Sequence, residues 1–186
     1  MGNIVGRGVL CVMLVGGIVS ADTTRPLIKG KTVTITVNKS ATLGGLSISF
    51  GNAHHKHAAD GDTLGMWTFV AKKGRSKKEI ELRSEDANFE AEVAIHGVAL
   101  VFRHVEYEKF NVTLFAQKAP RPLDDETCAD RVSVLAAKQG LKEGPSRGYS
   151  NRSGIVTVTS GGWTGYCGTL TKRVWIETAS AVDDTK

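Results

Sequence analysis

The chain has 186 residues, with 24 lysines and arginines against 19 acidic residues. This length suits one domain, and the small positive charge favours anionic partners only weakly. Beyond residue 21 no apolar run is long enough to span a bilayer as a helix, which excludes a membrane-spanning mature chain.

Residues 1–21 are typical of a secretory signal peptide. One cation, Arg7, precedes an apolar run over Gly8–Val19, and small residues at Val19-Ser20-Ala21 suit a signal peptidase. Cleavage before Asp22 would remove one of the 24 cations and no acid, which leaves 23 − 19, or +4. We therefore expect a secreted or periplasmic protein. An uncleaved anchor or a buried N-terminal helix is the alternative.

The segment 31–117 predicts half-buried antiparallel strands. β-Branched and aromatic residues alternate with polar residues at a period of two, and glycine-rich breaks separate the runs. The alternating apolar positions of the first runs are Val33, Ile35, Val37, Leu46, Ile48, Phe50, Trp67, Phe69, Ala71, Ile80 and Leu82. This pattern indicates an antiparallel β-sandwich.

Within residues 89–117 the sequence predicts a hairpin with a two-residue turn at His96-Gly97, because glycine and, less readily, histidine accept positive φ. The resulting register pairs Val93 with Leu100, Ala91 with Phe102, Phe89 with His104 and Glu90 with Arg103. A second turn at Glu108-Lys109 would set Phe102 beside Phe115 and His104 beside Thr113. His104 then faces inward at the margin of the core.

One α-helix is predicted, over about 125–139. Asp124 can cap its start, and Gly140 ends it with Leu141 placed for a Schellman contact. We expect this helix to cover the outer face of the hairpin strands, which would carry Val101, Val105, Val112 and Leu114. The predicted fold class is mainly β, an antiparallel β-sandwich with one C-terminal-half α-helix packed on a sheet face.

Residues 22–186 form a single secreted β-rich domain in this interpretation. Sandwich strands occupy 22–120, and the helix and late strands occupy 121–186. Cys11 leaves with the signal peptide, so Cys128 and Cys167 form an even pair that we expect to be a disulfide. Closing a loop of about 40 residues contributes roughly 4 kcal/mol on a chain-entropy account.

Three histidines, His54, His55 and His57, fall within four positions of the stretch "GNAHHKHAADGD". On an extended segment His55 and His57 project to the same side, roughly 6 to 7 Å apart, which suits two imidazoles on Cu²⁺ or Zn²⁺. Asp60 or Asp62 could add a carboxylate. The alternative is a polar loop between strands.

A second candidate is the basic stretch "KKGRSKK", which places Lys72, Lys73, Arg75, Lys77 and Lys78 within seven residues. Its position between two strands predicts a hairpin tip that could dock on sulfated glycan or lipopolysaccharide. No aromatic residues interleave with the cations, which argues against single-stranded nucleic acid. The alternative is a solvated turn that protects a sheet edge.

The stretch "GGWTGYCG" offers Trp163 and Tyr166, which either stack on sugars or pack against the disulfide. No hydrolase, zinc-protease or phosphate-loop motif occurs, although a dispersed active site stays open. The sequence therefore predicts a secreted, non-catalytic binding protein. Its partner is a divalent transition metal at the histidines or an anionic surface polymer at the basic stretch.

Overall fold

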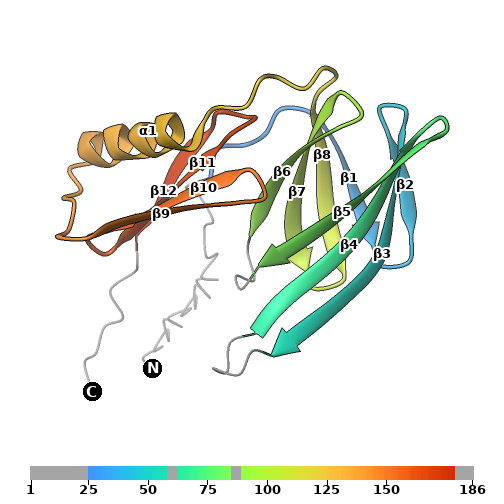
Figure 1. The fold of residues 1–186 in the computed structure, drawn as a ribbon, viewed down its shortest axis with the longest axis horizontal. Helices are drawn as coiled ribbons and strands as arrows, with labels where there is room; N and C mark the ends of the chain where they lie inside the picture. Colours follow the sequence, from blue (N-terminus) through green and yellow to red (C-terminus); the bar gives the residue numbers. More distant parts are fainter. Residues whose placement is uncertain (1–24, 58–62, 85–88, 179–186) are drawn as a thin grey trace, which may run out of the picture.

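A computed structural model describes residues 25–57, 63–84 and 89–178 of the chain (Figure 1). The predicted signal peptide, residues 1–21, lies outside these ranges. The described part is mainly β, with one α-helix in the C-terminal half. The elements are β1 (Lys31–Thr36), β2 (Ser40–Leu43), β3 (Leu46–His57), β4 (Thr63–Lys73), β5 (Ser76–Ser84), β6 (Glu90–Ile95), β7 (Val98–Glu106), β8 (Lys109–Ala116), α1 (Asp125–Lys138), β9 (Arg147–Arg152), β10 (Ile155–Ser160), β11 (Trp163–Gly168) and β12 (Val174–Thr178).

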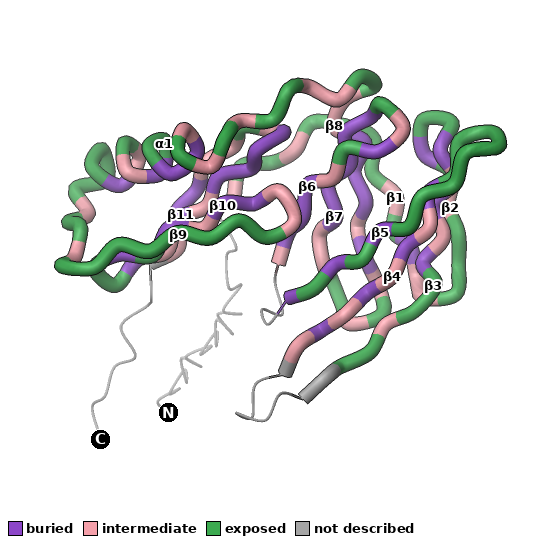
Figure 2. Tube along the Cα trace, viewed as in Figure 1, coloured by how far each residue is buried: buried purple, intermediate pink, exposed green. Residues whose placement is uncertain are grey.

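The strands form three four-stranded antiparallel sheets, in the orders β1-β8-β7-β6, β2-β3-β4-β5 and β12-β11-β10-β9. Buried side chains of the first two sheets belong to one core cluster, and Figure 2 shows buried positions recurring along their strands. Aromatic rings join the two sheets, since Phe50 meets Phe110 edge-on at 5.5 Å and Phe69 meets Phe102 at 4.9 Å between ring centroids. The period-two pattern of the sequence therefore fills one core from two sheets.

The β6–β7 hairpin confirms the predicted register. Glu90 pairs with Arg103, Ala91 with Phe102 and Val93 with Leu100. The turn residues His96 and Gly97 have φ values of 48° and 78°, as a two-residue hairpin turn requires.

The predicted register of the next hairpin is wrong. The turn falls at Tyr107-Glu108, and Phe102 and His104 lie opposite Val112 and Phe110 rather than Phe115 and Thr113. The pairing shifts at two irregularities, between Ala99 and Leu100 and between His104 and Glu106. A β-bulge adds a residue to one strand and changes the register beyond it, so simple pairing from the turn fails.

The helix α1 begins and ends as predicted. The Asp124 side chain accepts a hydrogen bond from the Thr127 amide at 2.7 Å. At the other end Gly140 has φ of 72°, and the Leu141 amide donates to the Ala136 carbonyl at 3.0 Å, which is the long bond of a Schellman motif.

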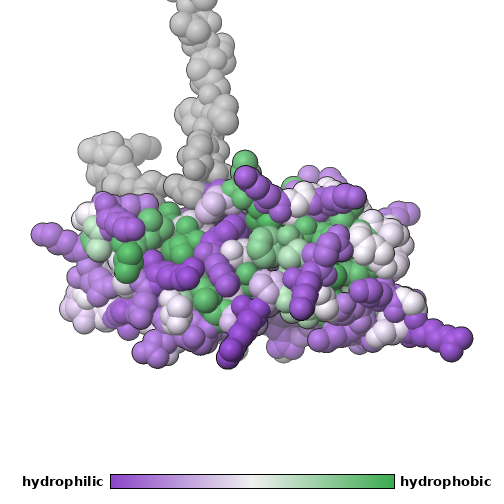
Figure 3. All heavy atoms as spheres, turned by 90° about the horizontal axis from the view of Figure 1, so that it is seen from above, coloured by the Kyte–Doolittle hydropathy of each residue, from purple (hydrophilic) through white to green (hydrophobic). Residues whose placement is uncertain are grey.

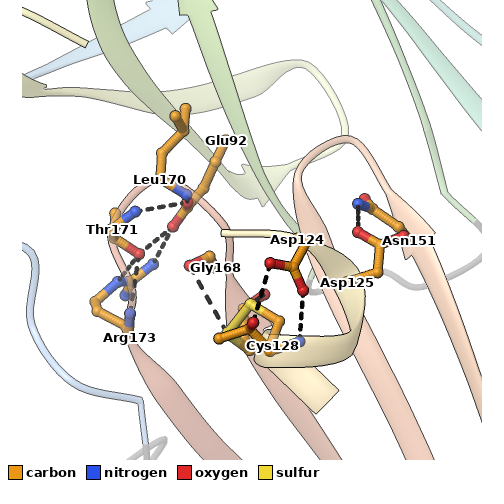
Figure 4. Close-up of a disulfide and its surroundings, with 11 residues drawn as sticks. Glu92, Asp124, Asp125, Cys128, Asn151, Gly168, Leu170, Thr171 and Arg173 are labelled. Carbon is orange, nitrogen blue, oxygen red and sulfur yellow. Dashed lines mark hydrogen bonds and ion pairs between the residues drawn. A yellow bond between two sulfur atoms is a disulfide. The ribbon is translucent and has the colours of Figure 1, made fainter. Parts of the chain in front are cut away.

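The expected position of α1 over the outer face of β7 and β8 is wrong. Its buried side chains form one cluster with β10, β11 and β12, and a Cβ at Gly165 of β11 would overlap Val132 of the helix. The physical reason is the shifted register, because Val112 and Leu114 turn into the core of the first two sheets. The predicted disulfide Cys128–Cys167 is present and joins the start of α1 to β11 (Figure 4).

The segment after β11 lies against the outer face of β6 and covers Glu92. One Glu92 carboxylate oxygen accepts from the Leu170 amide at 2.8 Å and the Thr171 amide at 2.9 Å, and the other accepts from the Thr171 hydroxyl (Figure 4). Arg173 pairs with Glu90 and lies 3.6 Å from Glu92. We call Glu90, Glu92 and Arg173 the buried charge cluster.

Burial raises the pKa of the Glu92 carboxyl, an effect that the hydrogen bonds from Thr171 and Leu170 partly offset. Burial also lowers the pKa of Arg173 to about 10, and the nearby Arg25 acts in the same direction. A Cβ at Gly168 would overlap the Glu92 carboxylate, so glycine there allows the close approach. The third sheet is thus fixed to the first through buried charges. Within the described residues, α1 lacks the length and apolar character that crossing a bilayer demands.

Candidate functional site

The basic stretch forms the tip of the β4–β5 hairpin, as predicted. Gly74 has φ of 59° in the turn, and Lys72 lies opposite Lys77 across the strands. All five cations are exposed. We call Lys72, Lys73, Arg75, Lys77 and Lys78 the basic tip. Viewed from above, hydrophilic side chains project at the right-hand margin, the side on which Figure 1 places this hairpin (Figure 3).

His96 anchors the basic tip to the neighbouring β6–β7 turn. Its Nε2 lies 3.3 Å from the Ala71 carbonyl oxygen, and its Nδ1 lies 3.3 Å from the Ser76 hydroxyl. A neutral ring protonated at Nε2 satisfies both contacts, because Nε2–H then donates and Nδ1 accepts. The Lys73 ammonium donates to the His96 carbonyl at 3.3 Å. The sequence had indicated a turn residue only, and these contacts add a supporting role.

Little local charge opposes the basic tip. Lys77 pairs with Glu79 at 3.0 Å, and both side chains are more than half exposed. Exposed ion pairs of this kind are weak and compete poorly with a multivalent partner. Among the described residues, Lys77–Glu79 is the one salt bridge that the five cations of the basic tip form. The basic tip can therefore present several positive charges to one anionic partner.

The histidine stretch lies at the opposite end of the same sheet. His54 and His55 are exposed near the end of β3, paired with Met66 and Gly65 of β4. Neighbouring strand residues point to opposite faces, so these two side chains diverge. The His55 ring stacks on Tyr107 with 3.9 Å between centroids and 13° between planes.

The rest of the predicted metal site falls where the structure gives no side chains. His57 ends β3 without a described side chain, and Asp60 and Asp62 lie outside the described residues. No group of three potential metal ligands occurs among the described residues. The metal site at His54, His55, His57 and Asp60 therefore stays a prediction.

The other two histidines do not join that stretch in one site. His96 belongs to the basic tip's end of the fold. His104 faces inward as predicted and is half-buried, with its ring 5.2 Å from both Trp67 and Phe110. It lies among aromatic rings at the core margin.

In the "GGWTGYCG" stretch the two aromatics have different roles. Trp163 is 2% exposed and belongs to the cluster around the disulfide, and its indole N–H donates to the Lys142 carbonyl at 3.1 Å. Tyr166 stacks on Trp175 of β12 at 5.2 Å. Packing against the disulfide is thus correct for Trp163 and not for Tyr166.

Sequence reasoning missed a cavity of about 270 Å³ at the junction of the first and third sheets. Its wall includes Arg25, Arg83 and Arg152, the carboxylates of Glu90 and Glu177, and the rings of Phe89, Tyr166 and Trp175. We call this the junction cavity. These residues come from distant parts of the chain and form no local motif, so no sequence signal could have found it.

Comparison of the chain with protein-family models, with curated proteins and with solved structures gave no significant match. The function is therefore argued from the geometry of the described residues.

Proposed function

We propose that this protein is an exported, non-catalytic binding protein that docks on anionic surface polymers through the basic tip. The observation that carries the proposal is the exposure of five cations on one hairpin tip. Neighbouring strands lie about 4.8 Å apart, so the cations of both strands can contact successive sulfate or phosphate groups of one polymer. Sulfated glycan and lipopolysaccharide both present such groups.

The anchoring of the tip supports this proposal. Contacts of His96 with Ala71 and Ser76 hold the hairpin against the β6–β7 turn. A surface that is ordered before binding loses less conformational entropy on association. An anchored hairpin tip is therefore better suited to docking than an unanchored, solvated loop.

The body of the protein suits export in this proposal. The first two sheets act as a β-sandwich and carry the tip, and α1 closes one face of the third sheet. The Cys128–Cys167 disulfide is compatible with an oxidising compartment. The signal-like residues 1–21 would direct the chain there.

Retention on immobilised heparin and on lipopolysaccharide tests the tip. We expect Lys72→Gln/Lys73→Gln/Arg75→Gln to lose most of its retention, because three of five exposed cations are removed. Its matched control is Arg131→Gln/Lys138→Gln/Lys142→Gln, which removes three exposed cations from the helix side of the molecule. Equal retention of the tip variant and the wild type contradicts the proposal, and so does equal loss in both variants.

A second candidate, transition-metal binding at the histidine stretch, is favoured by the stacking of His55 on Tyr107. That contact orients one imidazole at the end of β3, and His57 follows two residues later on the same strand. Asp60 of the same stretch is a further potential ligand, whereas His54 points to the opposite face of β3 from His55.

Calorimetry with Cu²⁺ and Zn²⁺ tests the metal site. We expect copper to bind more tightly than zinc at a nitrogen-rich site and His55→Ala/His57→Ala to lose binding by more than about tenfold. His96→Ala is the control, because His96 lies at the other end of the fold. Unchanged metal binding in the double variant would contradict a metal site and favour the alternative, a polar loop between strands.

A further inference from the structure

The contacts that hold His96 beside the basic tip fit both the neutral and the charged form of its ring. Nε2 lies 3.3 Å from the Ala71 carbonyl oxygen, and Nδ1 lies 3.3 Å from the Ser76 hydroxyl. A neutral ring donates from Nε2 and accepts at Nδ1, whereas a charged ring donates from both nitrogens. Because the exposed Ser76 hydroxyl can accept as well as donate, it can turn its hydrogen toward water. The anchor therefore tolerates a proton on His96.

Cationic side chains approach the His96 turn from two neighbouring segments. From β4, the Lys73 ammonium donates to the His96 carbonyl at 3.3 Å. The segment after β8 reaches the same turn, because the Ala119 amide donates to the Gly97 carbonyl at 2.8 Å, and Lys118 just before it is exposed. A charge on His96 would therefore add to a surface that is already positive.

Acidic groups do little to offset that charge. On the tip hairpin, the Glu79 carboxylate pairs with Lys77. On the strand that leads into the turn, Glu92 faces Arg173 instead. None of the ion pairs among the described residues includes His96. In this part of the chain, the charge of a protonated His96 is therefore available to an anionic partner.

The charge of the protein and the charge of its partner respond differently to pH. Histidine changes its charge between about pH 5 and 8, while lysine and arginine stay charged throughout this range. Phosphate groups gain a proton near about pH 6, whereas the sulfate esters of a glycan stay ionised. On a sulfated glycan, a change in affinity over this range therefore reports on the protein.

We propose that His96 is a titratable part of the polyanion-binding surface, so that the basic tip binds sulfated glycan more tightly at acidic than at neutral pH. The inference rests on the proposed function of the basic tip and adds its regulation by pH. A bound polyanion favours the charged ring, so binding takes up a proton at His96. Because this coupling is reciprocal, affinity rises as the pH falls.

The affinity for a heparin oligosaccharide at about pH 5.5 and about pH 8, at one ionic strength, tests the proposal. We expect the wild type to bind about two- to fivefold more tightly at the lower pH, the contribution of one exposed ion pair. His96→Gln should bind equally at both, because glutamine donates and accepts but does not titrate. His54→Gln is the matched control, because it removes an exposed histidine from β3, and it should keep the wild-type ratio.

The ratio of the two affinities is the quantity that decides. A loss of anchoring in His96→Gln would weaken binding at both pH values and leave the ratio unaffected, so it cannot imitate the loss of a titrating charge. Proton uptake is a second readout, because calorimetry near about pH 6.5 in buffers of different ionisation enthalpy counts the protons taken up as heparin binds. We expect uptake by the wild type and His54→Gln, and almost none by His96→Gln.

The outcomes separate this proposal from the proposed function of the basic tip. Heparin binding by the wild type that depends on salt but not on pH overturns the role of His96 and leaves the function of the tip intact. A wild-type ratio, or wild-type proton uptake, in His96→Gln also overturns the role of His96. An absence of heparin binding at both pH values overturns the function of the tip and the role of His96 with it.

Discussion

Glu92 is 4% exposed and carries its carboxylate between the first and third sheets. Two backbone amides and one hydroxyl donate to it, and Arg173 supplies positive charge at 3.6 Å. A charge so far from water persists only when such partners replace its hydration. Removing one member of the cluster therefore leaves the others unsatisfied.

Glu92→Gln should lower the free energy of unfolding by about 3 to 5 kcal/mol, because it removes a buried charge that faces Arg173 and turns an amide group toward donors. Glu81→Gln is the control, since Glu81 is exposed and pairs with Arg83, and it should cost about 1 kcal/mol or less. Urea denaturation compares the two. Equal effects would show that the cluster contributes no more than a surface pair.

The buried charge cluster could not be predicted from the sequence. Glu90 and Glu92 alternate with Ala91 and Val93 just as the exposed face of a half-buried strand would. Their cover comes from a segment far along the chain, and no local pattern records that contact. The register opposite Arg103 was nevertheless correct, because hairpin geometry is local.

At the scale of single elements, the helix start gives a pH-dependent prediction. Hydrogen bonds from the Thr127 amide and hydroxyl hold the pKa of Asp124 below its ordinary value of 3.8. A carboxyl with a lowered pKa in the folded state stabilises the fold above its unfolded pKa, and this contribution is lost as the pH falls through the folded value.

Asp124→Asn should therefore melt at a lower temperature than the wild type at pH 7, and the difference should shrink as the pH falls below about 4. Asparagine keeps an acceptor for the Thr127 amide but carries no charge for the positive end of the helix. Thermal unfolding followed by circular dichroism across this range measures the difference. A difference that stays constant with pH would contradict the assigned role of the Asp124 charge.

The ends of helices and the turns of hairpins could be predicted from the sequence where a few neighbouring residues determine them. The cap at Asp124, the stop at Gly140 and the turn at His96-Gly97 each follow from the conformational preference of a few residues. The β7–β8 register was missed because the turn lies one residue earlier than predicted and an irregularity between His104 and Glu106 then shifts the pairing, and none of the residues there is a glycine that would mark a bulge. The sheet on which α1 packs was mispredicted for the same reason. Val112 and Leu114 lie in the core of the first two sheets and do not form the outer apolar face that the predicted register implied.

At the scale of the whole molecule, the two sites predicted from sequence lie at opposite ends of one sheet (Figure 1). His55 lies opposite Gly65 of β4, and Lys72 of the basic tip lies seven residues further along that strand (72 − 65), a distance of roughly 24 Å at the usual rise. The two sites can therefore be altered independently. The junction cavity lies away from the tip, near the end of β5 that carries Arg83 and Ser84.

The central claim is that the basic tip binds polyanions, and the salt dependence of affinity tests it most directly. Dissociation constants for a heparin oligosaccharide should be measured over a series of NaCl concentrations for the wild type, the tip variant and its charge-matched control. We predict a steep loss of affinity with salt for the wild type and the control. The slope of the tip variant should be smaller by about 2 to 3, near one unit per removed contact. An unchanged slope in the tip variant would contradict the claim.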